Sequence, residues 1–466
     1  MQDIDTGSGF GSLPLKPSTL ETLDQLGYRE MTAIQAAALK DALAGKDLIA
    51  QAETGSGKTA VFALTLLANL NRRRFAVQAL VLCPTRELAD QVAAEIRRIA
   101  RGEENTKVIV LCGGVPLRGQ SSSLEHGAHI IVGTPGRILD HMERGTLRLD
   151  AINTFVLDEA DRMLDMGFID AIIRIAEACP PDRQTLLFSA TYPEGIERLA
   201  KRFLKRPLRV QAENKRPNEA IDERSYEIRN EDRFESVAAL LRAFHPERAL
   251  AFCNTRQSCR ELTTFLRDRG LSALELNGDL EQWERDQVLA RFAGKSVSVL
   301  VATDVASRGL DIEKLEAVVN VDIPADPEIY THRIGRTARA GETGLALSLF
   351  DASELALVRR IEAYRDREIA RGDIAEIEET TDTPPPVPSM ITLQILSGKK
   401  DKIRPGDILG ALTGDAGFTT EQVGKIKIAE TWSYVAVERT IAEEAARKLN
   451  EGKIKGRSVR VKVLGN

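Results

Sequence analysis

The chain has 466 residues, of which 43% are hydrophobic and 29% are charged, and its formal net charge is −5. This composition supports a buried core and excludes disordered and collagen-like chains, and the length predicts two to four domains. No apolar run approaches the ~18 residues of a membrane span, and the first residues lack signal character. The five cysteines are scattered without a metal-ligand pattern. We therefore expect reduced thiols, no structural metal, no membrane and a cytoplasmic location.

The first half alternates apolar, strand-like runs with amphipathic helical stretches such as Glu87–Arg101. The expected strands are 47–50, 79–83, 107–112, 129–132, 154–157 and 185–189. Repeated strand-then-helix order with buried strands predicts a parallel sheet covered by helices on both sides. We assign this first domain to residues 1–212.

A polar stretch, Gln211–Glu223, lacks apolar periodicity and contains a proline, so it is interpreted as an interdomain linker. The alternation then resumes in a second α/β domain at residues 220–371. Its expected strands are 249–252, 273–276, 297–301 and 317–321.

An acidic and then proline-rich segment, residues 372–389, is typical of an extended spacer rather than a packed element. The remaining residues, 390–466, predict a small α+β domain in the order β-α-β-β-α-β. This tail carries 14 Lys+Arg and 9 Asp+Glu, whereas the preceding residues carry 50 and 60. A basic end on an acidic body indicates contact with a polyanion, although a solvated surface remains the simpler alternative.

A glycine-rich segment follows the apolar run 48–50 and precedes a helical stretch. It reads Ala52-Glu53-Thr54-Gly55-Ser56-Gly57-Lys58-Thr59. Such a loop turns its backbone N–H groups toward phosphate oxygens at a helix N-terminus. Lys58 would reach the β- and γ-phosphates, and the Thr59 hydroxyl would bind Mg²⁺. The alternative is an ordinary Gly/Ser-rich turn, which the Lys-Thr spacing makes the weaker interpretation.

Two carboxylates, Asp158 and Glu159, stand directly after the strand expected at 154–157. Asp158 is suited to hold Mg²⁺, and Glu159 to orient the attacking water. Taken alone, such acidic residues more often begin a helix, where the dipole favours them. The upstream phosphate loop favours the catalytic interpretation.

Together these segments resemble the DEAD-box RNA helicases over nearly everything before the spacer. Further matching motifs, in chain order, are Pro84–Leu88, Gly113-Gly114, Thr134–Arg137, Ser189–Thr191, Phe252–Thr255, Gln282–Arg285, Ala302–Asp304, Ser307–Asp311 and His332–Arg339. The resemblance implies two RecA-like domains in tandem, ATP and Mg²⁺ as cofactors, and RNA-stimulated ATP hydrolysis.

The resemblance also implies residue roles. Phe10 would stack on adenine, Gln35 would hydrogen-bond its edge, and Asp311 would contact the ribose; Ala33 stands where the family usually has proline. RNA phosphates and sugars would be bound by Thr85, Arg86, Gly113, Thr134, Arg137, Arg285 and Thr303. Arg336 and Arg339 would act as arginine fingers on the γ-phosphate, with surface salt bridging as the alternative. Ser189 and Thr191 would couple the nucleotide site to the RNA surface, and His332 would join the contact network between the two domains.

The tail resembles the RNA-binding domain of the bacterial DbpA subfamily at Ser397–Leu412, Gly424–Ile426 and Gly452–Gly456. This resemblance implies a hairpin of 23S rRNA and 50S assembly intermediates as partners. Two basic loops would neutralise phosphates: Lys399, Lys400, Lys402 and Arg404 in one, Lys453, Lys455 and Arg457 in the other. Trp432 and Tyr434 alternate on an expected strand, so bases could stack on both. Trp432 could equally be a core or edge residue.

The sequence therefore predicts a monomeric ATP-dependent RNA helicase that locally remodels 23S rRNA during assembly of the 50S subunit. One alternative is an RNA-binding or annealing protein whose ATP cycle only times a clamp. Another is a general-purpose DEAD-box helicase without rRNA specificity. A DNA helicase is disfavoured by the full motif set.

Overall fold

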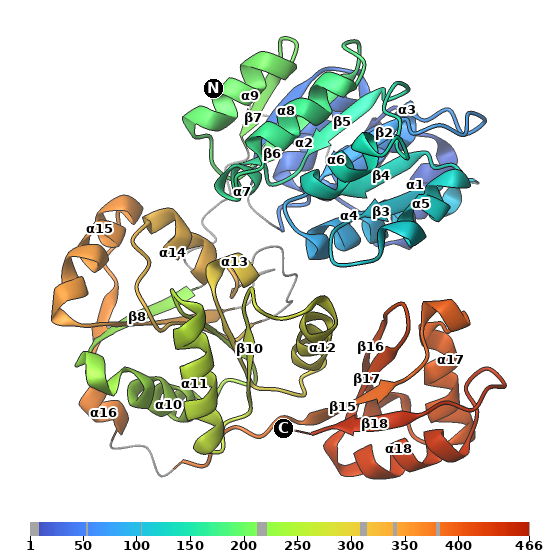
Figure 1. Cartoon of the computed structure of the whole chain (residues 1–466). Coiled ribbons are helices and arrows are strands. Elements are labelled where there is room, and N and C mark those ends of the chain that lie inside the picture. Colours follow the sequence, from blue (N-terminus) through green and yellow to red (C-terminus); the bar gives the residue numbers. More distant parts are fainter. Residues whose placement is uncertain are drawn as a thin grey trace. The chain divides into compact units, whose positions relative to one another are not determined.

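The computed structural model describes residues 9–52, 55–103, 105–211, 221–307, 315–338, 343–378 and 383–465. These residues form two compact units, the first ending with β7 (Leu208–Gln211) and the second beginning with β8 (Ile221–Glu227) (Figure 1). None of the described helices combines the length and apolar character that a bilayer crossing requires. All five cysteines are buried and free.

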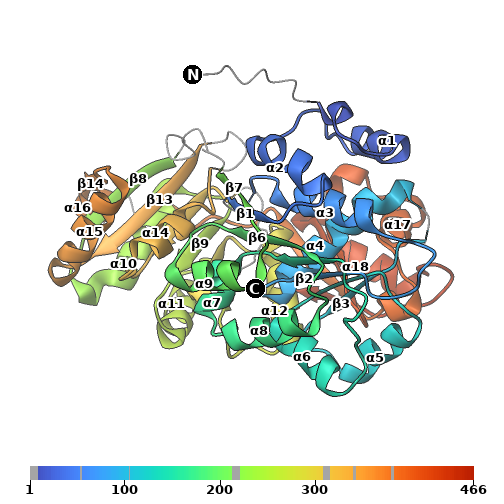
Figure 2. The same ribbon diagram turned by 90° about the horizontal axis from the view of Figure 1, so that it is seen from above.

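The first unit is built on a seven-stranded, all-parallel sheet (Figures 1 and 2). Its order is β3 (Val108–Leu111), β4 (Ile130–Gly133), β2 (Ala79–Leu82), β5 (Thr154–Leu157), β6 (Gln184–Ser189), β1 (Leu48–Gln51) and β7. Its helices are α1 (Pro17–Gln25), α2 (Ala33–Leu43), α3 (Lys58–Asn69), α4 (Arg86–Ile99), α5 (Leu117–Glu125), α6 (Pro135–Glu143), α7 (Ala160–Asp165), α8 (Ile169–Ala178) and α9 (Glu194–Phe203).

Successive residues of each strand point to opposite faces of this sheet, and both faces are covered. Ala79 and Val81 of β2 pack in a core with α2, α3 and α4, whereas Leu80 and Leu82 pack in a second core with α6, α7, α8 and α9. Continuous apolar strands are therefore required, which explains why six of the strand predictions lie within two residues of the observed strands. The expected α/β class is confirmed.

The second unit begins with another all-parallel sheet. Its order is β10 (Ala273–Leu276), β11 (Val299–Ala302), β9 (Ala249–Phe252), β12 (Ala317–Asn320), β13 (Gly344–Phe350), β8 and β14 (Ala370–Gly372). Its helices are α10 (Arg233–Phe244), α11 (Arg256–Asp268), α12 (Gln282–Ala293), α13 (Asp304–Ser307), α14 (Pro327–Ile334), α15 (Leu355–Arg365) and α16 (Ile374–Glu378).

Two sequence interpretations differ from the structure at the edges of this sheet. The linker predicted at 211–223 includes the end of β7 and the start of β8, and only its middle, 212–220, lies outside the described residues. The buried position of Glu223 in β8 is charged and is neutralised by Arg365, so no apolar alternation marks the strand. Part of the predicted spacer is also packed, because Ile374 and Ile377 of α16 contact the core around α10.

The tail forms the predicted β-α-β-β-α-β domain with a four-stranded antiparallel sheet. The sheet order is β16 (Val423–Ile428), β17 (Ser433–Glu438), β15 (Met390–Ile395) and β18 (Val461–Leu464), and the helices are α17 (Pro405–Gly410) and α18 (Ala442–Glu451). Successive residues of each strand again point to opposite faces of the sheet. On one face, Leu393, Val435 and Val437 pack against the helices in the core of the tail.

The opposite face of the tail sheet packs against α12 and the loop that follows it. The Thr392 hydroxyl lies 2.7 Å from the Ser296 hydroxyl, and Lys427 Nζ lies 3.3 Å from Asp286 Oδ1. A Cβ atom built on Gly294 would lie only 2.9 Å from the Cβ of Ala436, so the two backbones approach closely there. RNA-recognition modules use this sheet face to stack bases. In this chain the face instead makes an intramolecular contact with α12 and the loop after it.

Candidate nucleotide and RNA site

The carboxyl ends of the parallel strands collect the predicted motifs of the first unit at one edge of its sheet. The phosphate loop follows β1, Thr85 follows β2, Gly113 follows β3, and Thr134 follows β4. The acidic pair follows β5, and Ser189 ends β6. Parallel strands with short connections place such segments side by side, as in other open α/β sheets that bind ligands at this edge.

The phosphate loop requires glycine at two described positions. Gly55 and Gly57 adopt positive φ values of 87° and 93°, which L side chains rarely occupy. A Cβ atom on Gly57 would lie 2.5 Å from Gln35 Nε2, because that amide donates a hydrogen bond to the Gly57 carbonyl. Lys58 then begins α3, whose unpaired N–H groups favour an anion. Glu53 and Thr54 lie outside the described residues.

Lys58 is buried beside the two predicted catalytic carboxylates. Its Nζ lies 3.2 Å from Asp158 Oδ1 and 3.9 Å from Glu159 Oε1. Burial alone would lower the pKa of Lys58, but Asp158, Glu159 and Asp161 together raise it above its usual value. The cluster therefore keeps a fixed positive charge at the start of the phosphate-binding helix.

Asp158 has the environment expected of a cation ligand. It is fully buried, and neither carboxylate oxygen accepts a hydrogen bond from the residues that the structure describes. Burial raises the pKa of Asp158, an effect that the nearby Lys58 opposes. Buried carboxylates are normally satisfied. Among the described residues, the Lys58 ammonium, 3.2 Å from Oδ1, is the polar partner of this carboxylate, so its remaining lone pairs fit a Mg²⁺ ion, and Thr59 stands beside Lys58 at the start of α3.

Glu159 is held in an unusual backbone conformation. Its φ and ψ are both 54°, a left-handed geometry that is strained for a non-glycine residue. The carboxylate is 3% exposed, and its Oε2 lies 3.1 Å from a guanidinium nitrogen of Arg162. Strain at such a residue is consistent with a functional constraint, because the packing must hold the side chain in one position.

Asp161 links the acidic motif to the Ser189–Thr191 segment. Its Oδ2 accepts hydrogen bonds from the backbone N–H groups of Ala190, at 3.0 Å, and Thr191, at 2.9 Å. Its own N–H donates to the Ser189 hydroxyl at 3.2 Å. Ser189 and Thr191 were predicted to be coupling residues, but the role of Asp161 was missed. Its spacing of three residues from Asp158 is the signal that could have identified it.

Gln35 and Phe10, the predicted adenine-binding residues, are both buried in the first unit. Gln35 Oε1 accepts the backbone N–H of Thr32, and its Nε2 is bound to the phosphate loop. The Phe10 ring packs edge-on against Tyr28 with centroids 5.9 Å apart. The proposed base-reading amide is therefore connected directly to the loop that would hold the phosphates.

The predicted RNA-binding residues of the first unit stand on the same edge as the nucleotide motifs. Thr85 caps α4 by accepting the N–H of Leu88, and Gly113 has open space around its Cα. Arg86 has a buried nitrogen without a hydrogen-bond partner among the described residues. Arg137 instead donates to Val115 O at 3.0 Å and Gln120 Oε1 at 2.7 Å, so in this structure it organises the loop after β3.

Motif residues of the second unit gather around Arg333, which sequence reasoning did not single out. Arg333 is 1% exposed and makes a bidentate ion pair with Asp304, with nitrogen–oxygen distances of 2.7 and 2.8 Å. It also donates to Asn254 Oδ1 and to the Asp322 carbonyl. Because periodicity does not reveal a buried arginine, only the tertiary structure identifies this role.

Of the other predicted residues of the second unit, Arg336 and Thr303 are buried and Arg285 donates to the Ala306 carbonyl. His332 lies on α14, one residue before Arg333. Asp311 and Arg339 lie outside the described residues.

The two predicted basic loops of the tail form one surface. Lys455 Nζ donates to the Lys402 carbonyl at 2.6 Å, and Arg457 lies 3.5 Å from Asp401. Lys399, Lys400 and Arg404 belong to the first loop, and Lys453 to the second. A phosphate chain can therefore contact cations from both loops at once.

The two aromatic residues of the tail do not form an exposed stacking platform. Tyr434 is 1% exposed, and burial raises its pKa to about 12. Trp432 lies in the turn before β17 rather than in the strand, and its backbone carbonyl accepts the N–H of Ala429. Tyr434 is therefore closed to base stacking in this structure, and Trp432 lies outside the strand in which it was predicted.

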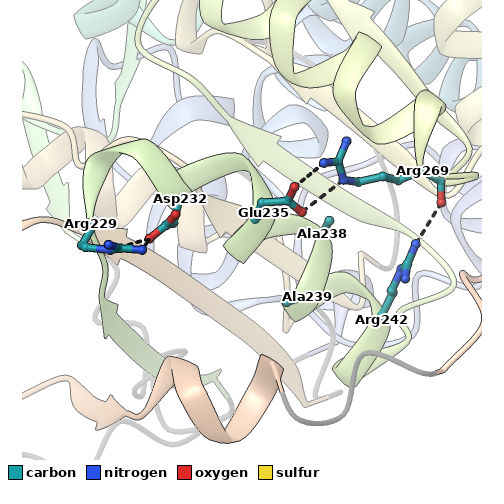
Figure 3. Close-up of a pocket in the computed structure, with 7 residues that line it drawn as sticks. All are labelled: Arg229, Asp232, Glu235, Ala238, Ala239, Arg242 and Arg269. Atoms are coloured by element: carbon teal, nitrogen blue, oxygen red, sulfur yellow. Dashed lines mark hydrogen bonds and ion pairs between the residues drawn. The ribbon is translucent and has the colours of Figure 1, made fainter.

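Away from the predicted motifs, a hollow of about 530 Å³ lies in the second unit beside α10 (Figure 3). Its lining residues are Arg229, Asp232, Glu235, Ala238, Ala239, Arg242 and Arg269. Arg229 pairs with Asp232, Arg269 pairs with Glu235, and Arg242 donates to the Arg269 carbonyl (Figure 3). These arginines are paired with groups of the wall, and the predicted motif residues do not line this hollow.

Comparisons with known proteins agree with this geometry. Residues 32–199 match the DEAD/DEAH box helicase family, residues 232–341 the helicase conserved C-terminal domain, and residues 392–463 the DbpA RNA binding domain. The ATP-dependent RNA helicase DbpA of Escherichia coli (strain K12) is 50% identical over 457 residues, which cover 97% of this chain and 98% of that protein.

Other relatives match the two helicase domains. A DEAD-box ATP-dependent RNA helicase CshA of Bacillus cereus is 44% identical over 79% of this chain and 70% of its own length. A solved structure of S. cerevisiae Dbp5 bound to RNA and ADP BeF3 is also similar, with a TM-score of 0.72 and 31% sequence identity. The match covers 81% of this chain and 99% of the Dbp5 chain. From the matched domains and the arrangement of its nucleotide motifs, the chain belongs to the DEAD-box ATP-dependent RNA helicases of the DbpA type.

Proposed function

We propose that this helicase uses ATP and Mg²⁺ to separate short duplexes in 23S rRNA during assembly of the 50S subunit, acting as a monomer in the cytoplasm. The buried cluster of Lys58, Asp158 and Glu159 beside the glycine loop supports ATP hydrolysis most directly. The DbpA RNA binding domain at residues 392–463 supports RNA as the partner, and the proposal of 23S rRNA extends the resemblance of this tail to the DbpA subfamily.

In the nucleotide site, Lys58 and the N-terminus of α3 bind the phosphates. Glu159 orients the attacking water and accepts its proton. Asp158 and Thr59 would hold Mg²⁺, which supplies positive charge next to the β- and γ-phosphates. Gln35 reads the adenine edge, and Phe10 and Asp311 contact the base and the ribose.

Hydrolysis requires residues from both units. The phosphate loop belongs to the first, whereas the proposed fingers Arg336 and Arg339 belong to the second. Cations supplied from a second element stabilise the charge that develops in phosphoryl transfer. Closing the two units around ATP and RNA therefore couples the two ligands, and Ser189, Thr191 and His332 transmit this coupling. A single strand bound in the closed state would be withdrawn from its duplex.

The tail selects the RNA through its basic surface rather than its sheet face. Tyr434 is buried, and the sheet packs on α12, so base stacking there is blocked in this arrangement. Lys400 and Arg404 are exposed beside the second basic loop. We propose that this surface binds the 23S rRNA hairpin and thereby brings the helicase core to a nearby duplex.

The decisive experiment measures ATPase stimulation by rRNA fragments for the wild type and for a Lys400→Ala/Arg404→Ala variant. The variant is expected to lose its preference for the hairpin-containing fragment while weaker, indiscriminate stimulation remains. Arg447→Ala, which removes an exposed arginine of α18 paired with Glu451, is the matched control. Equal preference in all three proteins would contradict the proposal.

Strand displacement on a tailed hairpin duplex separates the helicase from an ATP-timed clamp. ATP-dependent displacement supports the helicase, whereas ATP-dependent retention without displacement supports the clamp. Stimulation of wild type by every RNA equally would instead favour a general-purpose helicase.

A further inference from the structure

The opposite edge of the first sheet, formed by the amino ends of its strands, carries a second set of cations. Arg72, Arg73 and Arg74 precede the exposed Phe75 in the loop between α3 and β2. Lys205 and Arg206 stand before β7. This amino edge is separated from the ATP and RNA motifs by the length of the strands, because all of those motifs follow carboxyl ends. None of the roles assigned above uses it.

A hollow of about 700 Å³ lies on this edge. It is lined by Gly45, Lys46, Asp47, Asn69, Asn153, Asp182, Arg183, Gln184, Lys205 and Arg206. Its charged residues comprise four cations and two carboxylates. The amides are ordered: Asn69 Nδ2 donates to Gln184 Oε1 at 2.9 Å, and Asn153 Nδ2 donates to Asn69 O at 3.0 Å. The floor is therefore polar and rigid.

The carboxylates of the hollow are already satisfied, whereas three exposed arginines of the amino edge form no ion pair with the described residues. Asp47 accepts the backbone N–H groups of Thr185 and Lys205, and Asp182 pairs with Lys205 at 3.0 Å. Among the described residues, the side chains of Arg73, Arg74 and Arg206 make no ion pair. Arg183 is buried and donates to the Pro180 carbonyl at 2.9 Å, so it belongs to the wall of the hollow. The exposed Arg73, Arg74 and Arg206 therefore leave positive charge on this edge, whereas Arg72, Lys46 and Lys205 are paired with carboxylates.

The arginine loop is held in a defined conformation. Gln78, which is buried, donates to the carbonyls of Asn71 and Arg74 and accepts the N–H of Asn71. The Phe75 ring packs against His129 at a centroid distance of 4.9 Å but remains 64% exposed. An exposed aromatic ring on a fixed loop loses little conformational entropy when a base stacks on it.

We propose that the amino edge, defined by the exposed residues Arg73, Arg74, Phe75 and Arg206, is a second RNA-binding surface that contacts RNA flanking the duplex held by the motifs. The cations neutralise phosphates, and Phe75 stacks on an unpaired base. Charge complementarity favours RNA, because a polyanion gains from contact with several exposed arginines at once. The inference depends on family membership as an RNA helicase but not on the identity of its rRNA target.

The test compares wild type with Arg73→Ala/Arg74→Ala and with Phe75→Ala in equilibrium binding to two RNAs over a range of salt concentrations. One RNA is a long, structured rRNA fragment. The other is a short single strand that can bind only to the RNA-binding motifs at the carboxyl ends of the strands. Arg174→Ala, which removes an exposed arginine paired with Glu143, is the matched control. The substituted side chains are exposed, so the thermal unfolding midpoints should be unchanged.

For the long RNA, the double variant should reduce the slope of log affinity against log salt by about 1.8, since each lost phosphate contact contributes about 0.9 on a duplex. Phe75→Ala should weaken binding at least about fivefold, the lower limit for one stacked base. Binding and ATPase stimulation by the short strand should match wild type.

Two results would overturn the inference. One is an unchanged salt slope and unchanged affinity for the long RNA. The other is weaker binding to a ribosomal particle without any change on naked RNA, which would assign the edge to a protein partner. Failure of the tail variants described above would leave these outcomes unaffected, so the two proposals are tested separately.

Discussion

Replacing Glu159 with glutamine tests the proposed chemistry directly. Glutamine has nearly the same size, so it can occupy the same buried position and still accept a hydrogen bond from Arg162, which lies 3.1 Å from Glu159 Oε2. It keeps the left-handed backbone, because the strain at φ 54° is similar for both residues. What the substitution removes is the negative charge and the ability to accept a proton from water.

The magnitude follows from the role of a general base. Removing one typically reduces the rate by about 10²–10⁴-fold. At about 1.36 kcal/mol for each factor of ten, this raises the activation free energy by roughly 3–5 kcal/mol. ATP binding should change little, because Lys58 retains its 3.2 Å ion pair with Asp158.

Single-turnover ATP hydrolysis with saturating RNA measures the chemical step, and a fluorescent ATP analogue measures binding separately. Glu143→Gln, an exposed glutamate of α6, is the control and should behave as wild type. Hydrolysis of the Glu159→Gln variant within about threefold of the wild-type rate would refute the assignment of Glu159 as the base. A parallel loss of ATP affinity would mean that Glu159 acts in binding instead.

Three further predictions address the nucleotide pocket, the second unit and pH. Gln35→Ala should lower discrimination between ATP and GTP by at least about tenfold, measured as the ratio of kcat/KM values, because the base-reading amide is lost; an unchanged ratio would exclude this role. Arg333→Met should lower the free energy of unfolding by about 3–5 kcal/mol in urea, since it leaves Asp304 without its buried partner; a loss below about 1 kcal/mol would contradict this. Burial lowers the pKa of His129 below 6.5, so the unfolded chain binds the proton first and stability should fall as pH drops through 6.5. His129→Asn should remove part of this acid sensitivity in unfolding measurements, and an unchanged pH dependence would show that His129 does not cause it.

The sequence determined the α/β class and most strands because buried parallel strands must be apolar along their whole length. The strands predicted at 154–157, 249–252 and 273–276 coincide with β5, β9 and β10. Of the strands that were not predicted, β7, β8 and β14 carry charge, whereas β13 is apolar. In β8 the charge of Glu223 is neutralised by Arg365, which is 142 residues away along the chain. Such long-range compensation leaves no local periodic signal.

The identity of the site followed from sequence for a similar reason. A glycine loop, a lysine and paired carboxylates are short motifs, and the chemistry of each is contained in a few adjacent residues. Their juxtaposition was decided by the parallel sheet, which brings Lys58 to 3.2 Å from Asp158 across 100 residues of sequence.

Only the tertiary structure determined which side chains support these motifs and which surfaces remain available. Asp161 and Arg333 act through hydrogen bonds to distant backbone and side-chain groups, and Tyr434 became a buried contact because the tail sheet packs on α12. Composition and spacing specify the groups that a chain possesses. Whether water, RNA or another part of the protein reaches each group depends on packing between elements, which is a property of the folded chain alone.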